Sequence, residues 1–110
     1  MLSESEYEAK AFPELRALID ALDALTNDAF EAELASDILT IEFHDGTRYV
    51  VNSHRAARQI WMAAERSAWH FDWVAEKSRW IAHKSGDELW STLERVLGDK
   101  LGSKVALRAV

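Results

Sequence analysis

The stretch ILTIEFHDGTRYVVN, residues 38–52, decides the fold because it contains two strand-like runs joined by a hairpin turn. Residues 38–43 and 47–52 are rich in β-branched and aromatic side chains, which favour strands. Between them, Asp45-Gly46 is a strong hairpin signal, since glycine readily adopts the positive φ that such turns need. The stretch therefore predicts two antiparallel strands of a sheet.

Further strand-like runs lie on both sides of this hairpin. In residues 30–34 apolar side chains alternate with Glu31 and Glu33, so the two kinds face opposite ways. After the hairpin, strands are expected at residues 60–64, 69–73 and 79–83, the last of them following a turn through residues 76–78. The pattern predicts about six strands in total.

The chain before these strands is expected to form a helix. Its apolar side chains recur every three or four residues, which defines one helical face: Tyr7, Ala11, Leu15, Leu18, Leu22 and Leu25. Either Ser3-x-x-Glu6 or Ser5-x-x-Glu8 provides a capping box at the start. Pro13 lies inside this pattern, so we expect a helix kinked there.

A second helix is expected near the other end of the chain. Ser85-x-x-Glu88 is a capping box that would open it. Its apolar stripe consists of Leu89, Trp90, Leu93, Val96 and Leu97. Gly98 or Gly102 would end the helix, and Val105 and Leu107 in the tail would then pack against the helices.

The order helix, strands, helix predicts an α+β fold with a single domain over residues 1–110. Both terminal helices can pack on one face of the antiparallel sheet, which gives a two-layer α-β sandwich. The other face of the sheet would then remain open to water. Side chains on that face are available to partners.

Composition limits the classes of function. The chain has no cysteine, which excludes disulfides and thiolate metal sites, and no apolar run long enough to span a membrane. The acidic N-terminal segment is unlike a signal or transit peptide, so a cytoplasmic protein is expected. No P-loop, dinucleotide fingerprint, G-x-S-x-G motif or cysteine nucleophile is present, so we expect a binding protein without catalytic residues.

Charge is distributed unevenly along the chain. Residues 1–45 hold twelve carboxylates against two cations, a net charge of −10, and the remaining residues hold seven against eleven, a net charge of +4. The acidic part should repel nucleic acid and anionic membranes and attract cations or basic protein surfaces. A face that serves only solubility is the simpler alternative.

Within the acidic part, five carboxylates are candidate metal ligands, and we refer to them as the acidic ridge: Asp20, Asp23, Asp28, Glu31 and Glu33. The first two are one turn apart on the polar side of the predicted helix, and the last two point outward from the first predicted strand. Like charges so close together repel one another unless a cation screens them. Oxygen ligands suit hard cations, among which are Fe³⁺ and loosely held Fe²⁺.

Other candidate residues lie in the predicted sheet. If Ile60 and Met62 point into the core, Trp61 lies on the open face, where an exposed tryptophan can anchor a protein partner, with Asn52 and Gln59 near it. A shift in strand register would instead bury Trp61. His70 and Asp72 share a face and could form a weak metal pair, but a solvated surface pair is the simpler interpretation.

The chain resembles the frataxin family, in its bacterial CyaY branch, over residues 5–100. The residues that carry the resemblance are residues 38–43, Asp45-Gly46, Asn52, Gln59-Ile60-Trp61-Met62-Ala63, His70-Phe71-Asp72, Trp80-Ile81, Ser85-Gly86, Leu89-Trp90 and Leu93. The segment Gln59-Ile60-Trp61, following a strand that ends in Asn52, is the most specific of them.

This resemblance implies the same α-β sandwich and weak binding of iron, as Fe²⁺ or Fe³⁺, at the acidic ridge. It also implies a role in iron–sulfur cluster assembly through a cysteine desulfurase of the IscS type, with the scaffold protein as a second candidate partner. Asp20, Asp23, Glu31 and Glu33 match ridge positions of the family, and Trp61 matches its exposed sheet tryptophan. A monomer is expected without iron, and an iron-dependent oligomer, a weak iron oxidase and an acidic protein-binding module without a metal role stay open.

Overall fold

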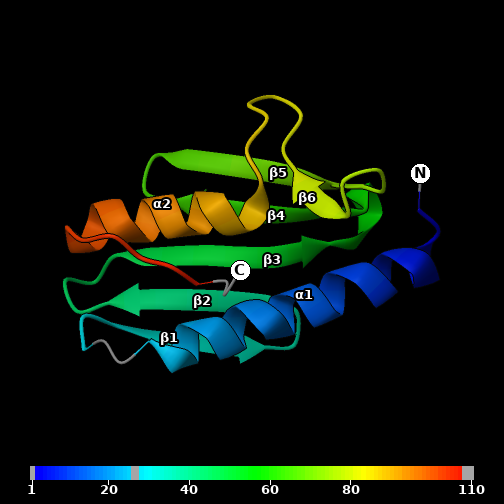
Figure 1. The fold of residues 1–110 in the computed structure, drawn as a ribbon. Helices are drawn as coiled ribbons and strands as arrows, with labels where there is room; N and C mark the ends of the chain where they lie inside the picture. Colours follow the sequence, from blue (N-terminus) through cyan, green and yellow to red (C-terminus); the bar gives the residue numbers. More distant parts are fainter. Residues whose placement is uncertain (1, 26–27, 108–110) are drawn as a thin grey trace.

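The computed structural model describes residues 2–25 and 28–107 and has two helices on one face of a sheet (Figure 1). The helices are α1 (Glu4–Ala24) and α2 (Leu89–Leu101). Between them in the chain are the strands β1 (Phe30–Ala35), β2 (Ile38–Phe43), β3 (Arg48–His54), β4 (Gln59–Ala64), β5 (Ser67–Val74) and β6 (Arg79–Ile81). The predicted α+β sandwich is confirmed.

The six strands form one antiparallel sheet in which each strand pairs with its neighbours in the sequence. The hairpin predicted at Asp45-Gly46 joins β2 to β3, and Gly46 has a φ of 91°. Short connections of this kind favour a meander, because sequential strands then pair without crossovers. A short 3₁₀ helix, Arg55–Ala57, joins β3 to β4 and was not predicted.

Helix α1 begins where the first of the two predicted capping boxes lies. The hydroxyl of Ser3 accepts a hydrogen bond from the backbone N–H of Glu6, whose carboxylate accepts one from the N–H of Ser3. The helix continues through Pro13. Proline leaves the carbonyl of Ala9 without its helical partner, and Ala9 is exposed, so water can reach that carbonyl.

The start of α2 differs from the prediction. The N-cap is Glu88, whose carboxylate accepts hydrogen bonds from the N–H groups of Trp90 and Ser91. The predicted capping role of Ser85 is therefore wrong. Ser85 lies in a turn instead, closed by a hydrogen bond from the N–H of Ala82 to the carbonyl of Asp87. The same turn ends β6 at Ile81, before the predicted residue 83. Gly102 ends the helix, with a φ of 72°.

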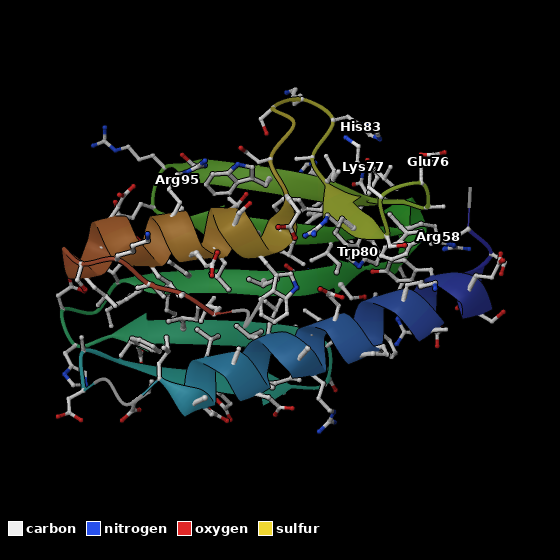
Figure 2. All side chains as sticks on the ribbon, in the orientation of Figure 1. Arg58, Glu76, Lys77, Trp80, His83 and Arg95 are labelled. Atoms are coloured by element: carbon white, nitrogen blue, oxygen red, sulfur yellow. The ribbon has the colours of Figure 1, made fainter. Side chains whose placement is uncertain are left out.

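The core lies between the sheet and the two helices. It includes the predicted stripe of α1 from Tyr7 to Leu22, and one side of each of the central strands. Trp80 is 1% exposed and lies between β6 and the helices, at the β6 end of the core (Figure 2). The tail after α2 runs back between the helices (Figure 1), where Val105 and Leu107 pack against the core as predicted. Neither helix is long and apolar enough to cross a membrane.

Candidate functional site

The acidic ridge lies along the edge of the sandwich formed by α1 and β1. Asp20 and Asp23 are exposed on α1, and Glu31 and Glu33 are exposed on β1. Asp28, also exposed, lies in the connection between these two elements. Helix α1 covers one face of the sheet, and the two glutamates point from the other face. The aspartates of α1 and the glutamates of β1 therefore lie on opposite sides of β1.

In the described structure the five ridge carboxylates lack a partner, as do a few other exposed acids such as Glu76 and Asp99. Within residues 2–25 and 28–107 none of them forms an ion pair or a hydrogen bond. Many carboxylates elsewhere are neutralised, for example Glu42 by Arg48 at 3.1 Å and Asp45 by Lys100 at 2.7 Å. The ridge therefore carries negative charge that the protein itself does not balance.

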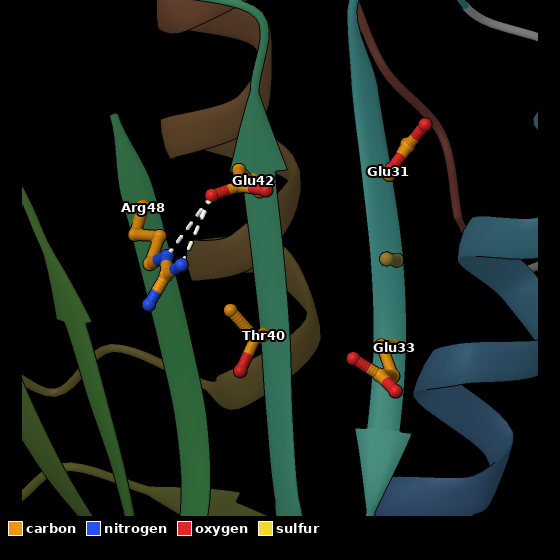
Figure 3. A pocket seen from close by; sticks show the side chains of 6 residues that line it. Glu31, Glu33, Thr40, Glu42 and Arg48 are labelled. Atoms are coloured by element: carbon orange, nitrogen blue, oxygen red, sulfur yellow. Dashed lines mark hydrogen bonds and ion pairs between the residues drawn. The ribbon is translucent and has the colours of Figure 1, made fainter. Parts of the chain in front are cut away.

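An open hollow of about 450 Å³ lies beside the strand half of the ridge (Figure 3). Glu31 and Glu33 line it from β1, Thr40 and Glu42 from β2, and Arg48 from β3. Glu31 lies directly opposite Glu42 in the register, and the ion pair with Arg48 balances only the second of these charges. In the described part of the chain, no group of three or more His, Asp or Glu side chains is close enough to hold a metal ion.

The helix-free face of the sheet contains the second set of predicted residues. The register aligns Ile38, Asn52, Trp61 and His70 across four neighbouring strands. Ile60 and Met62 are buried on the other side, so Trp61 has the predicted facing. Ile38, at the end of this row, is 47% exposed.

Trp61 is only half-buried, because two imidazole rings cover its faces. His54 stacks on it with ring centroids 3.7 Å apart and planes 9° apart, and His70 with centroids 4.1 Å and planes 14° apart. Two nearly parallel rings this close must lie on opposite faces of the indole. We refer to His54, Trp61 and His70 as the histidine–tryptophan stack.

His54 was not predicted as a site residue, since the strand was expected to end at Asn52. The strand continues to His54, which pairs with Gln59 in the register of β3 and β4. A signal existed in the alternation of Asn52 and His54, which places both side chains on the face that carries Trp61.

A chain of polar contacts holds the edge of the indole. Trp61 Nε1 donates to Gln59 Oε1 at 2.8 Å, and Gln59 Nε2 donates to Asp72 Oδ1 at 3.1 Å. The other oxygen of Asp72 lies 3.5 Å from His83 Nε2. Asp72 is thus engaged by Gln59 and His83, and it shares its face with His70 as predicted. The hydrogen bond between Gln59 and Trp61 therefore fixes the two side chains relative to each other.

The fold and its surfaces define a class: a small α+β sandwich with one open sheet face and an unpaired acidic edge. The sequence matches the family model described as a frataxin-like domain over residues 1–103. The chain belongs to the frataxin family, in its CyaY branch.

Relatives and solved structures agree with this assignment. The chain is 31% identical over 111 residues to the iron–sulfur cluster assembly protein CyaY of Ralstonia pickettii, covering 98% of this chain and 96% of the relative. It is 29% identical over 109 residues to the CyaY of Thioalkalivibrio sulfidiphilus, covering 96% of this chain and all of the relative.

Among solved structures, the frataxin of Psychromonas ingrahamii, a CyaY family protein, has the same fold, with a TM-score of 0.87 at 20% identity over 98% of this chain and all of that one. Trimeric yeast frataxin from Saccharomyces cerevisiae, solved in a complex with ferrous iron, has a TM-score of 0.74 at 26% identity, with 86% of this chain and 87% of that chain covered.

Proposed function

We propose that this protein is a weakly iron-binding regulator of iron–sulfur cluster assembly, and that it binds a cysteine desulfurase through the acidic ridge and the helix-free sheet face. The observation that carries the proposal is the set of five exposed ridge carboxylates without a cation partner, in a chain whose other acids are often paired. Unbalanced charge of this kind attracts either a metal cation or a basic protein surface.

The ridge residues fit a loosely held hard cation. Carboxylate oxygens are the ligands that such cations prefer, and the described residues offer them without a competing lysine or arginine. Because no three of these side chains converge in the described structure, binding would require side chains to reorient and water to complete the coordination. Iron binding is therefore expected to be weak, because reorienting these side chains costs free energy. The ferrous complex of yeast frataxin supports iron as the cation.

The sheet face supports a protein partner. Trp61 is held rigidly by the two imidazoles and by Gln59, so its binding to a partner would cost little side-chain entropy. Rigid aromatic side chains are frequent hot spots of interfaces. The names of the CyaY relatives support a partner from the iron–sulfur assembly machinery.

The proposed role is that of an adaptor and not of an enzyme. A general acid needs a carboxyl group in an apolar pocket that raises its pKa, and all five ridge carboxylates are exposed. A weak iron oxidase would show turnover of Fe²⁺ that is lost when the ridge is neutralised. An acidic protein-binding module would bind the desulfurase and show no iron binding.

Iron binding is tested by anaerobic titration with Fe²⁺, followed by calorimetry. The helix half of the ridge is neutralised by Asp20→Asn with Asp23→Asn, and the strand half by Glu31→Gln with Glu33→Gln. A matched control is Glu76→Gln with Asp99→Asn, which removes the same charge from exposed acids elsewhere. We expect the ridge variants to lose iron affinity and the control to keep it; equal losses would overturn the assignment of the ridge.

Partner binding is tested by measuring the association of the purified desulfurase with the same variants and with Trp61→Ala. We expect the ridge variants to slow association, with a difference that shrinks as salt is added, because steering by charge is screened. Trp61→Ala should mainly speed dissociation. A desulfurase that binds all variants like the unmodified protein would contradict the proposed contact surfaces.

A further inference from the structure

Strand β5 has an open edge over residues 67–71. On one side β5 pairs with β4 along residues 67–72. On the other side β6 pairs only with Asp72, Trp73 and Val74, because the chain turns away from the sheet after Ile81. Within the described structure, the outward backbone groups of residues 67–71 therefore have no strand partner.

The side chains of this edge lack the features that usually protect against another strand. Exposed edges normally carry charged side chains, proline or a bulge. Residues 67–71 contain no charged side chain other than the titratable His70, no proline and no glycine, and their pairing with β4 is continuous. The opposite edge, β1, carries Glu31 and Glu33 on its outer positions and packs against α1. The β1 edge thus carries charged side chains that hinder pairing with another strand, and the β5 edge does not.

A hollow of about 640 Å³ lies beside the open edge. It is lined by Trp69, His70 and Asp72 of β5 and by His83 and Lys84 of the segment between β6 and α2. In Figure 1 this segment rises beyond β5, and Figure 2 places His83 on it. Trp69 Nε1 donates to Asp87 Oδ2 at 3.1 Å, which ties the segment to β5.

The charges around the edge favour an acidic ligand. Arg66, next to one end of it, and Lys84, in the hollow, form no ion pair with the described residues. Of the nearby acids, Asp72 is engaged by Gln59 and His83, Asp87 by Arg95 at 3.4 Å and Glu65 by Lys100 at 3.6 Å, whereas Asp99 lines a hollow together with Arg66. The Ser85 hydroxyl and Arg95 together lower the pKa of the Asp87 carboxyl. Lys84, in the hollow, and Arg66, next to the first residue of the edge, therefore remain without an ion pair among the described residues.

We propose that residues 67–71 bind an extended acidic peptide segment of a partner protein, which adds to β5 as a further strand. Main-chain hydrogen bonds to the open edge provide the affinity, and carboxylates of the peptide meet Arg66 and Lys84. Side chains of the peptide on the helix-facing side enter the hollow beside Trp69. This binding mode is separate from the acidic ridge and from the histidine–tryptophan stack.

The test uses the full chain and a defined probe, a fluorescein-labelled peptide of the sequence Glu-Val-Thr-Val-Thr-Val-Glu. Backbone amide resonances are followed during titration, and we expect shifts and slowed hydrogen exchange at residues 67–71. Arg66→Glu with Lys84→Glu should weaken binding by about tenfold or more, since two attractive contacts become repulsive. The matched control, Arg16→Glu with Lys104→Glu, makes the same charge change at exposed sites away from the edge and should bind normally.

Two further probes separate strand addition from plain charge attraction. The same peptide with N-methylated backbone amides keeps its charges and loses its donors, so it should not bind; binding of this form would overturn the proposal. A peptide with lysine at both ends should bind more weakly. Shifts confined to residues other than 66–72 and 82–87, or no shifts at all, would also overturn it. Shifts at these residues that depend on protein concentration without peptide, with a doubled mass in light scattering, would identify a second copy of the chain as the occupant instead.

Discussion

Trp61 and Trp80 lie on opposite faces of the sheet, and substitutions should separate their roles. Trp80 is 1% exposed and packs edge-on against Tyr7 and Trp73, with ring centroids 6.0 and 5.6 Å away. Trp80→Ala should lower the free energy of unfolding by about 3 to 5 kcal/mol, as for a truncated core aromatic. Trp61→Ala should cost only about 1 to 2 kcal/mol, the value of its two imidazole stacks.

Urea denaturation of both variants measures this difference. Trp61→Phe serves as the control, because it keeps an aromatic ring between His54 and His70 and should lose less than Trp61→Ala. Equal losses for Trp61→Ala and Trp80→Ala would show that Trp61 contributes to the core.

Lys100 links the end of α2 to the hairpin between β2 and β3. Its Nζ lies 2.7 Å from Asp45 Oδ2, and this hydrogen bond, together with the N–H of Thr47, holds the pKa of the Asp45 carboxyl far below its usual range. A carboxyl group with a lowered pKa stabilises the fold above its unfolded pKa of about 4 and loses that contribution as pH falls.

We therefore expect Asp45→Asn to lower stability at neutral pH and to differ less from the unmodified protein as pH falls below about 4. Denaturation at a series of pH values tests this expectation. Glu76→Gln is the control, since Glu76 is exposed and forms no ion pair with the described residues. A difference that stays constant over the whole range would exclude the ion pair as its cause.

The sequence could predict on which face of the sheet Trp61 lies, but not which side chains lie beside it. Alternation with Ile60 and Met62 is sufficient to place Trp61 on the helix-free face. The histidine–tryptophan stack depends on which residues of β3 and β5 lie beside Trp61, and that is set by the register of three strands. The register follows from turn lengths, including the unpredicted 3₁₀ helix after His54, which local patterns do not reveal.

At the scale of elements, the strands were easier to predict than the start of α2. Strands β2 and β3 have a strong hairpin signal and near-continuous strand-forming residues, so both were recognised. The serine of Ser85-x-x-Glu88 matches a capping box in sequence, yet Gly86, with a φ of 79°, closes a turn that brings Asp87 back to Ala82. The hydrogen-bonded turn between β6 and α2 thus places Glu88, and not Ser85, at the N-cap of α2.

Substitution of the two candidate caps should distinguish them. Glu88→Ala removes the acceptor for the N–H groups of Trp90 and Ser91, and should lower the free energy of unfolding by about 1 kcal/mol, the usual value of an N-cap. Ser85→Ala removes a hydroxyl that contacts Asp87 in an exposed turn, and no acceptor for an N–H group of the helix, so it should cost less. Urea denaturation measures both, and a larger loss for Ser85→Ala would contradict the assigned cap.

At the scale of the whole molecule, the meander keeps the acidic charge at one side. The acidic first part of the chain forms α1, β1 and β2, whereas residues 59–107, with seven carboxylates and seven cations, carry no net charge and form β4, β5, β6 and α2 towards the other side of the sheet. Because strand order follows sequence order, the asymmetry along the chain becomes an asymmetry across the molecule. This is why a count of charges along the sequence could locate the acidic ridge, although not the separation of its two halves by β1.

This arrangement makes stability depend on salt. The ridge carboxylates repel one another without internal balance, so screening should raise the melting temperature as salt increases from about 10 mM to about 150 mM, where the Debye length falls from about 30 Å to about 8 Å. Salt also weakens the ion pairs of the chain, such as Arg48 with Glu42, so the ridge contribution must be isolated by comparison.

The comparison is with the variant that carries Asp20→Asn, Asp23→Asn, Glu31→Gln and Glu33→Gln. It retains the ion pairs and loses most of the ridge repulsion, so its melting temperature should be higher than that of the unmodified protein at low salt and should rise less with salt. Thermal scans of both proteins over the same salt series measure the difference. Parallel curves for the two proteins would mean that the ridge carboxylates are too far apart to repel one another appreciably, and would remove the electrostatic reason for a cation to bind there.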